Sequence, residues 1–168
     1  IVISGVTLGT STNGTYTLTV TAYDVAGNSK TGTAQIILDK TDPSTPTASI
    51  TGSSGSTTGH SKLAELGNIT IGVADADSNI DRFVLSGTGF DFTGASESDA
   101  AGSLNAGKDT FTFTTPAASD SIVISGVTLG TSANGTYTLT VTAYDVAGNS
   151  KEGTAQIILD KTDPSTAT

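Results

Sequence analysis

The chain has 168 residues and a net charge of −9, from 7 Lys and Arg against 16 Asp and Glu. This acidity argues against binding of nucleic acid or contact with an anionic membrane surface. The absence of Cys excludes a disulfide scaffold, thiol catalysis and a cysteine zinc site. No Met is present either, so we expect the sequence to be a piece of a longer protein.

Two copies of one segment frame the chain. Residues 1–45 and 122–166 are identical at 43 of 45 positions, with Thr12 against Ala133 and Thr31 against Glu152 as the differences. The period of 121 residues fits a whole domain and is too long for a solenoid unit. The repeat predicts that 1–45 is the last three strands of a preceding repeat, 46–166 a complete repeat, and 167–168 the start of the next linker.

Strand signals follow one another along the complete repeat. The segment "TYTLTVTAYD" at 136–145 alternates strictly between apolar residues and mainly Thr, as in a half-buried strand. The other predicted strands are 47–51, 69–74, 81–86, 110–115, 122–127 and 154–159. Of the two long connections, 52–68 contains "SKLAELG", for which we expect a helical turn, and 87–109 contains "FDFTG", for which we expect an extra edge strand. Seven short strands separated by turn residues predict an all-β sandwich.

One tyrosine narrows the type of sandwich. Tyr137 follows the turn residues Asn134 and Gly135, as does the corner tyrosine at the start of the sixth strand of an immunoglobulin-like domain. Leu139 then occupies the place of the second Cys of antibody domains. The fold class predicted is therefore an immunoglobulin-like, Greek-key β-sandwich without the disulfide.

Three acidic segments are expected to lie at the same end, or pole, of this sandwich. The loop after the second strand, "ADADSNID", the loop after the sixth, "YDVAGNSK", and the entering linker, "DKTDP", all lie at the pole of the N-terminus. So many carboxylates repel unless a hard cation neutralises them, and Ca²⁺ takes six to eight oxygen ligands. The predicted calcium ligands are Asp39, Asp42, Asp75, Asp77, Asn79, Asp81, Asp145 and Asn149.

The first of these loops resembles an EF-hand only at its beginning. Ile80 stands where that loop needs Gly, and Ser86 where it needs Glu. The alternative is a polar loop with Asx turns and no ion. By the same placement Asp24 and Asn28 serve the pole of the first copy, and Asp160 and Asp163 await a following repeat.

The sequence contains no arrangement of residues typical of a catalytic site. The single His60 lies in a loop rich in Gly, Ser and Thr, with nothing to organise a Ser-His-Asp site. Asp91 paired with Asp99 or Asp109 lacks the aromatic platform of a glycosidase. We therefore expect no enzyme activity.

Two segments resemble a known family. "VTAYDVAGNSK" and "AQIILDKTDPSTPTASI" resemble the bacterial immunoglobulin-like repeats of giant surface adhesins, including the calcium-dependent RTX adhesins of biofilm-forming bacteria. The resemblance implies an extender repeat on the bacterial cell surface, with neighbouring repeats as partners and calcium at the junctions. The second Asp and the Lys of "DKTDP" depart from the family pattern.

The incomplete first copy raises a question of partners. The linker is too short for residues 1–45 to close onto 46–120 of the same chain, so these strands either exchange with another molecule or remain poorly ordered. We expect strand exchange in an ordered crystal, and an isolated, solvent-faced hairpin there would contradict it. The alternative function is a carbohydrate-binding immunoglobulin-like module, which needs an exposed polar or aromatic cluster away from the junctions.

Overall fold

The computed structural model describes residues 2–9, 12–53, 56–130 and 133–165. Residues 167–168, the predicted start of a linker, lie outside these ranges. Contacts divide the chain into two units, Ile1–Thr41 and Asp42–Thr168, and the repeat boundaries at 45 and 46 stay a prediction. Among the described residues no helix is long and apolar enough to cross a membrane.

The first unit is a β-hairpin. Strands β1 (Gly14–Tyr23) and β2 (Ser29–Leu38) pair antiparallel from Gly14 opposite Leu38 to Tyr23 opposite Ser29. The sequence predicts three strands in this copy, but residues 2–9 form none. Their copy in the second unit pairs with β5 (Ile69–Ala74), and the first unit has no counterpart of that strand to hold them.

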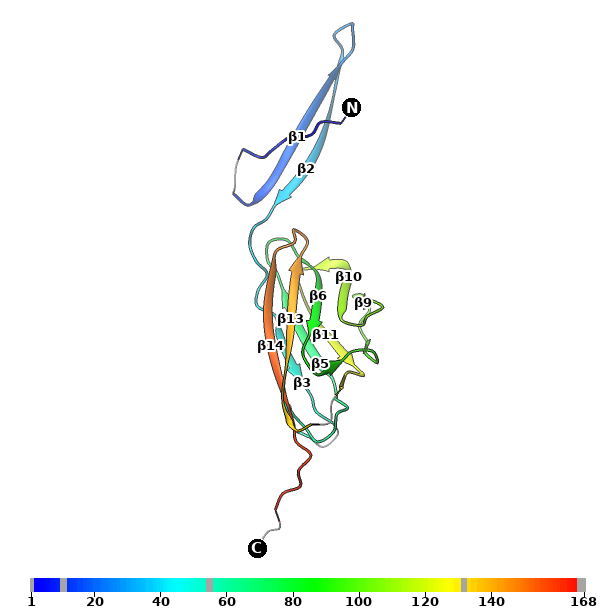
Figure 1. Ribbon diagram of the computed structural model, residues 1–168. Coiled ribbons are helices and arrows are strands. Elements are labelled where there is room, and N and C mark those ends of the chain that lie inside the picture. Colours follow the sequence, from blue (N-terminus) through cyan, green and yellow to red (C-terminus); the bar gives the residue numbers. More distant parts are fainter. Residues whose placement is uncertain (1, 10–11, 54–55, 131–132, 166–168) are drawn as a thin grey trace. The chain divides into compact units, whose positions relative to one another are not determined.

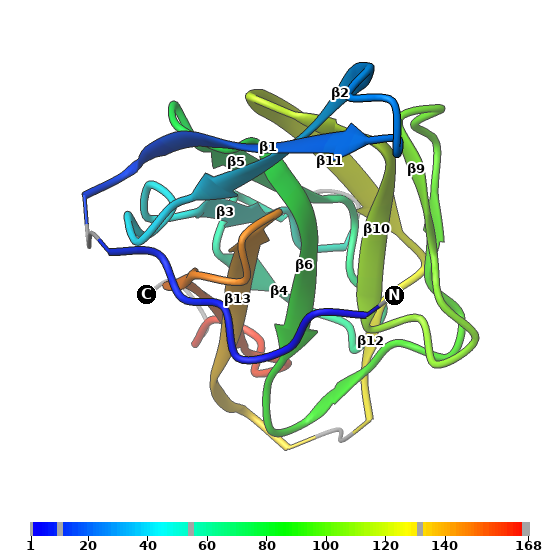
Figure 2. The ribbon, with the colours of Figure 1, turned by 90° about the horizontal axis from the view of Figure 1, so that it is seen from above.

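The second unit has two main sheets (Figures 1 and 2). In the larger sheet the order is β4 (His60–Ser61), β14 (Ser150–Leu159), β13 (Gly135–Asp145), β6 (Ile80–Ser86), β10 (Thr110–Ala117) and β9 (Gly102–Leu104). In the smaller sheet it is β3 (Thr47–Ile50), β5, β11 (Ser119–Ser125) and β8 (Ser96–Glu97). A separate pair joins β7 (Phe90–Asp91) to β12 (Thr128–Leu129).

The core lies between the two sheets and follows the alternation of the strands. Every second residue of β5 and of β13 from Leu139 onward is buried, while the Thr residues between them are half-buried. Phe83, Phe111 and Phe113 form an aromatic group at the centre, with ring centroids 5.1 to 6.4 Å apart. The predicted all-β immunoglobulin-like sandwich is confirmed.

The predicted corner tyrosine, Tyr137, is confirmed, and Tyr16 makes the same bond in the first copy. The hydroxyl of Tyr137 donates to the carbonyl of Ala133 at 2.7 Å, and that of Tyr16 donates to Thr12 at 2.5 Å. Each bond ties the start of a strand to the turn before it, four residues upstream.

The predictions for the two long connections, 52–68 and 87–109, have different outcomes. The expected edge strand is present only in part: β7, within "FDFTG", has two residues and pairs with β12 apart from the two main sheets. The expected helical turn in "SKLAELG" is wrong, because this segment bends at residues 62–64 and then pairs through a single bridge, from Glu65 to Thr128. Leu66 N–H donates to the Val127 carbonyl at 3.2 Å, and Leu129 N–H donates to Ala64 at 2.8 Å. These bonds to a distant segment replace the local ones that a helical turn would make.

Candidate metal centre

Loops from distant parts of the sequence meet at one pole of the second unit. Ser44 N–H donates to the carbonyl of Ala74, the last residue of β5, at 3.0 Å. Val146, just after β13, donates its N–H to Asn79 at 3.1 Å. The entering linker and the connections β5–β6 and β13–β14 are therefore joined by backbone hydrogen bonds at this pole (Figure 1).

Two aspartates at this pole are buried like core residues. In β5 the buried positions are Ile69, Ile71 and Val73, and Asp75 continues that alternation one step beyond the strand. In β13 Asp145 continues the buried series in the same way. Their exposed fractions are 4% for Asp75 and 1% for Asp145, so the fold places two carboxylates where its strand pattern calls for apolar side chains.

The two carboxylates lie close together. One oxygen of Asp75 and one of Asp145 are within 4.8 Å of each other. Asp145 accepts hydrogen bonds from Asn149, at 2.8 Å from its N–H and 2.7 Å from its side-chain amide. Asp75 Oδ1 accepts the N–H of Asp77 at 2.9 Å.

The second oxygen of Asp75 lacks a donor. Oδ2 is buried and accepts no hydrogen bond from any described residue. A buried anionic oxygen without a donor is costly, and buried charges in proteins are usually paired or bound to a metal. The arrangement therefore has the chemistry of an oxygen site for a hard cation.

Four other predicted ligands lie outside this pair. Asp77 and Asn79 are exposed, and Asn79 has a positive φ of 66° at the turn. Asp81 forms an ion pair with Arg82 at 2.9 Å, whose guanidinium lies 4.2 Å above the ring centre of Tyr144. Asp42 lies 3.6 Å from the Lys151 ammonium. None of the four shares the burial of Asp75 and Asp145.

The motif Asp-x-Ala-Gly-Asn builds the same turn in both copies. In the first unit, Asn28 donates to Asp24 at 2.8 Å from both its N–H and its side-chain amide, as Asn149 does to Asp145. The amide of Asn28 and then its N–H lower the pKa of Asp24 from the ordinary value. Gly27 and Gly148 have φ of 86° and 95°, which explains the Gly of the motif. The turn thus needs these residues whether or not an ion binds.

A second shared device fixes the aspartate that ends each copy, and we name it the Asn clamp. The Asn13 side chain donates to Asp39 Oδ1 at 2.9 Å and to the Thr41 hydroxyl at 2.8 Å, and accepts the Lys40 N–H at 3.1 Å. In the second unit, Asn134 makes the same three bonds to Asp160, Thr162 and Lys161, at 3.0, 2.9 and 3.1 Å.

The clamped aspartates also accept from the chain two residues on. Thr41 N–H donates to Asp39 Oδ1, and Thr162 N–H to Asp160 Oδ1, both at 2.9 Å. The N–H of Thr162 and then its hydroxyl lower the pKa of Asp160. The clamp therefore holds a carboxylate in a fixed orientation at the end of each copy. Asp163, the other predicted residue there, is exposed.

Sequence reasoning brought Asp75 and Asp145 to one pole but ranked them no higher than their neighbours. The signal that separates them is their strand parity, since both continue an inward-facing apolar series. The roles of Asn13 and Asn134 were missed, and no spacing rule for loops would have indicated a bond across 26 residues.

The fold and this pole define an immunoglobulin-like module with a polar junction at one end. Comparison with protein families agrees: a model described as bacterial Ig-like domain (group 3) matches residues 33–159, and one described as bacterial Ig-like domain matches residues 6–40. The chain belongs to the bacterial Ig-like domain family. No curated protein matches it. Domains of this kind are usually found in extracellular or surface proteins, and they are typically structural modules without enzymatic activity.

Proposed function

We propose that the polar end of the second unit binds Ca²⁺ and that the ion stiffens the joint between consecutive repeats. The observation that carries the proposal is the buried pair of Asp75 and Asp145, with one Asp75 oxygen lacking a donor. All donors are oxygens, which suits a hard cation, and Ca²⁺ tolerates irregular ligand geometry better than Mg²⁺ does.

Asp39 is the third ligand in this proposal. Ser44 is tied to Ala74 next to Asp75, and Asp39 precedes Ser44 by only five residues. The Asn clamp already orients the Asp39 carboxylate, which lowers the entropy lost when the ion binds. The bound ion supplies positive charge that neutralises the carboxylates and links the linker to the pole.

Residues 42–46 of the linker are held against the second unit by protein contacts, without an ion. Pro43 and Pro46 fix their φ angles. Asp42 pairs with Lys151, and Pro46 packs against Gly153 so closely that a Cβ there would lie 2.0 Å from the Pro46 carbonyl oxygen. Residues 42–46 are thus seated on the sandwich, and Asp39 to Thr41 are the part left for the ion to hold.

The function that follows is mechanical. The chain supplies one and a fraction extender repeats of a large bacterial cell-surface adhesin, of the RTX or biofilm-associated type, and its partners are neighbouring repeats. The near-identity of copies 121 residues apart supports a repeated structural role. The negative charge keeps such an array soluble, and the array holds a separate ligand-binding region away from the cell.

Calorimetric titration of the whole chain with CaCl₂ and with MgCl₂ tests the proposal. We expect a dissociation constant for calcium of about 0.1–1 mM, as in other extracellular calcium modules, and weaker binding of magnesium. Thermal unfolding in calcium should then occur at a higher temperature than in EDTA. The absence of both a binding heat and a calcium-dependent shift in Tm would contradict the calcium site and the stiffened joint together.

A further inference from the structure

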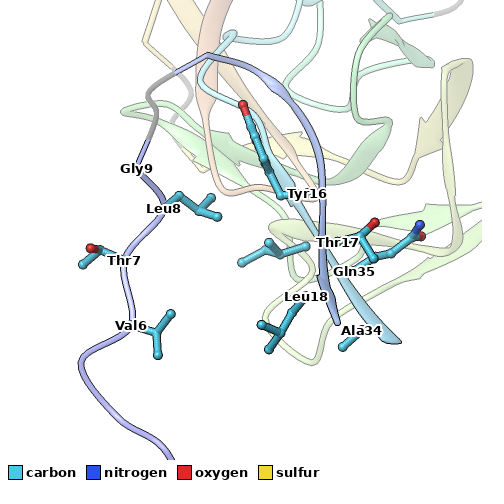
Figure 3. A pocket seen from close by; sticks show the side chains of 10 residues that line it. Val6, Thr7, Leu8, Gly9, Tyr16, Thr17, Leu18, Ala34 and Gln35 are labelled. Carbon is cyan, nitrogen blue, oxygen red and sulfur yellow. The ribbon is translucent and has the colours of Figure 1, made fainter. Parts of the chain in front are cut away.

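The cavity drawn in Figure 3 belongs to the first unit. It has a volume of about 480 Å³, and its lining includes Val6, Leu8, Tyr16 and Leu18. No charged side chain is among the residues that line it, so it offers a cation no carboxylate. Buried oxygens that lack a hydrogen bond lie instead at the pole of the second unit.

Ser78 carries one of these oxygens. Its Oγ is buried and makes no hydrogen bond with any described residue, as is the case for Asp75 Oδ2 three residues earlier. A buried hydroxyl without a partner is costly, and buried polar side chains in proteins are nearly always paired. Both oxygens belong to one short connection, residues 75–79, between the end of β5 at Ala74 and the start of β6 at Ile80.

Hydrogen bonds on both sides of Ser78 tie this connection to the two buried aspartates. On one side the N–H of Asp77 donates to Asp75 Oδ1 at 2.9 Å. On the other side the carbonyl of Asn79 accepts the N–H of Val146, which directly follows the second buried aspartate, at 3.1 Å. Ser78 is thus held between a residue bonded to one aspartate and a residue bonded to the neighbour of the other.

Exposure alternates along the connection. Asp77 and Asn79 are exposed, whereas Ser78 between them is half-buried and its hydroxyl oxygen is covered. The backbone of Asn79 has a positive φ of 66° and turns the chain into β6. The two predicted ligands therefore face solvent, and the residue between them directs its oxygen toward the protein interior.

We propose that the Ser78 hydroxyl is a further ligand of the cation bound by Asp75 and Asp145. The inference rests on the proposed calcium site and adds to it a residue that the pattern of acids does not indicate. Ca²⁺ takes six to eight oxygen ligands, and neutral oxygens contribute to that number. A hydroxyl supplies one of them without adding to the repulsion between the carboxylates.

Terbium luminescence of the whole chain tests this role, because Tb³⁺ replaces Ca²⁺ in oxygen sites and its lifetimes in H₂O and D₂O count the bound waters. In Ser78→Ala a water should take the place of the hydroxyl, so the number of waters on the ion should rise by about one. Displacement of Tb³⁺ by CaCl₂ should show a calcium affinity about 10-fold weaker. In EDTA the Tm should stay the same or rise, because the variant removes a buried hydroxyl that has no partner.

Two further variants serve as controls. Ser119→Ala removes an exposed hydroxyl at the same pole, opposite Ala74, and should change neither the water count nor the affinity. Ser78→Thr keeps a hydroxyl and should keep the water count of the unaltered chain.

The outcomes separate this inference from the calcium site itself. If the unaltered chain binds the ions and S78A binds them with the same water count and affinity, the ligand role of Ser78 is overturned and the site stands. A lower Tm of S78A in EDTA also overturns it, since the hydroxyl would then have a partner within the protein. If the unaltered chain binds neither ion, the calcium site fails and the role of Ser78 fails with it.

Discussion

Replacing Asp75 by Asn isolates the electrostatic cost that a bound ion would relieve. The amide keeps the size of the side chain and an oxygen for the Asp77 N–H, which now donates at 2.9 Å. It removes one of two negative charges that lie within 4.8 Å of each other. The variant should therefore raise the stability of the metal-free chain and lower the stabilisation that calcium adds.

The size of the first effect follows from the distance. Two unit charges 4.8 Å apart repel by about 3.5 kcal/mol at an effective dielectric constant near 20. Partial compensation by Asn149 and by solvent reduces this, so we expect D75N to be more stable than the unaltered chain by about 1–3 kcal/mol in EDTA. The result is a rise in Tm of about 3–10 °C for a unit of this size.

The second effect follows from linkage. An ion present at ten to one hundred times its dissociation constant stabilises the unaltered chain by about 1.4–2.7 kcal/mol. D75N should lose most of this gain, so that the two proteins approach each other in stability when calcium is added.

Urea unfolding at pH 7, with EDTA or with 10 mM CaCl₂, measures both effects. Asp99→Asn is the matched control, because Asp99 accepts an N–H two residues on at 2.9 Å, as Asp75 does, but lies outside the buried pair. D99N should keep the full calcium response. If D75N is less stable than the unaltered chain in EDTA, the repulsion argument is wrong, whatever the calcium response.

Three further predictions concern the linker and the turns. Gly153→Ala should destabilise the second unit by about 1–3 kcal/mol in urea unfolding, because its Cβ meets the Pro46 backbone, whereas Gly32→Ala, with nothing within 4 Å, should be neutral. Asn13→Ala should weaken calcium binding about 10- to 100-fold in calorimetry by releasing Asp39, and Asn134→Ala, which leaves Asp39 clamped, should not. Asn28→Ala should raise the lowered pKa of Asp24 toward 3.8 in a carboxyl NMR titration. Because the folded pKa is depressed, the stabilisation from Asp24 is present above the unfolded pKa and is lost as pH falls through the folded one, so the variant should lose less stability in acid.

The long strands were predictable because their alternation is a local signal. β5, β10, β13 and β14 all contain the predicted runs, and the corner tyrosine followed from its place after a turn. Strands of two or three residues such as β8 and β9 have no periodicity to read. The course of "SKLAELG" depends on hydrogen bonds to residues 127 and 129, which no pattern within the segment indicates.

The candidate site was predictable only as a region. The order of the loops in the fold places acidic residues at one pole, but the environment of each acid depends on the side chains beside it in the folded protein. Asp81 has Arg82 beside it, Asp42 has Lys151, and Asp77 faces solvent. Burial by the core distinguishes Asp75 and Asp145. That distinction becomes visible in the sequence once the inward parity of β13 is followed to its last residue and that of β5 one residue beyond its end.

The Asn clamp has a consequence for how an array of such repeats changes over generations. Everything that orients the terminal aspartate of a copy lies within that copy, from Asn134 to Thr162, and the buried pair lies wholly within the repeat that follows a linker. In the array that we propose, recombination that inserts or deletes a multiple of 121 residues therefore recreates the same joint wherever the crossover falls. The length of the array can change by whole units without a compensating mutation on either side.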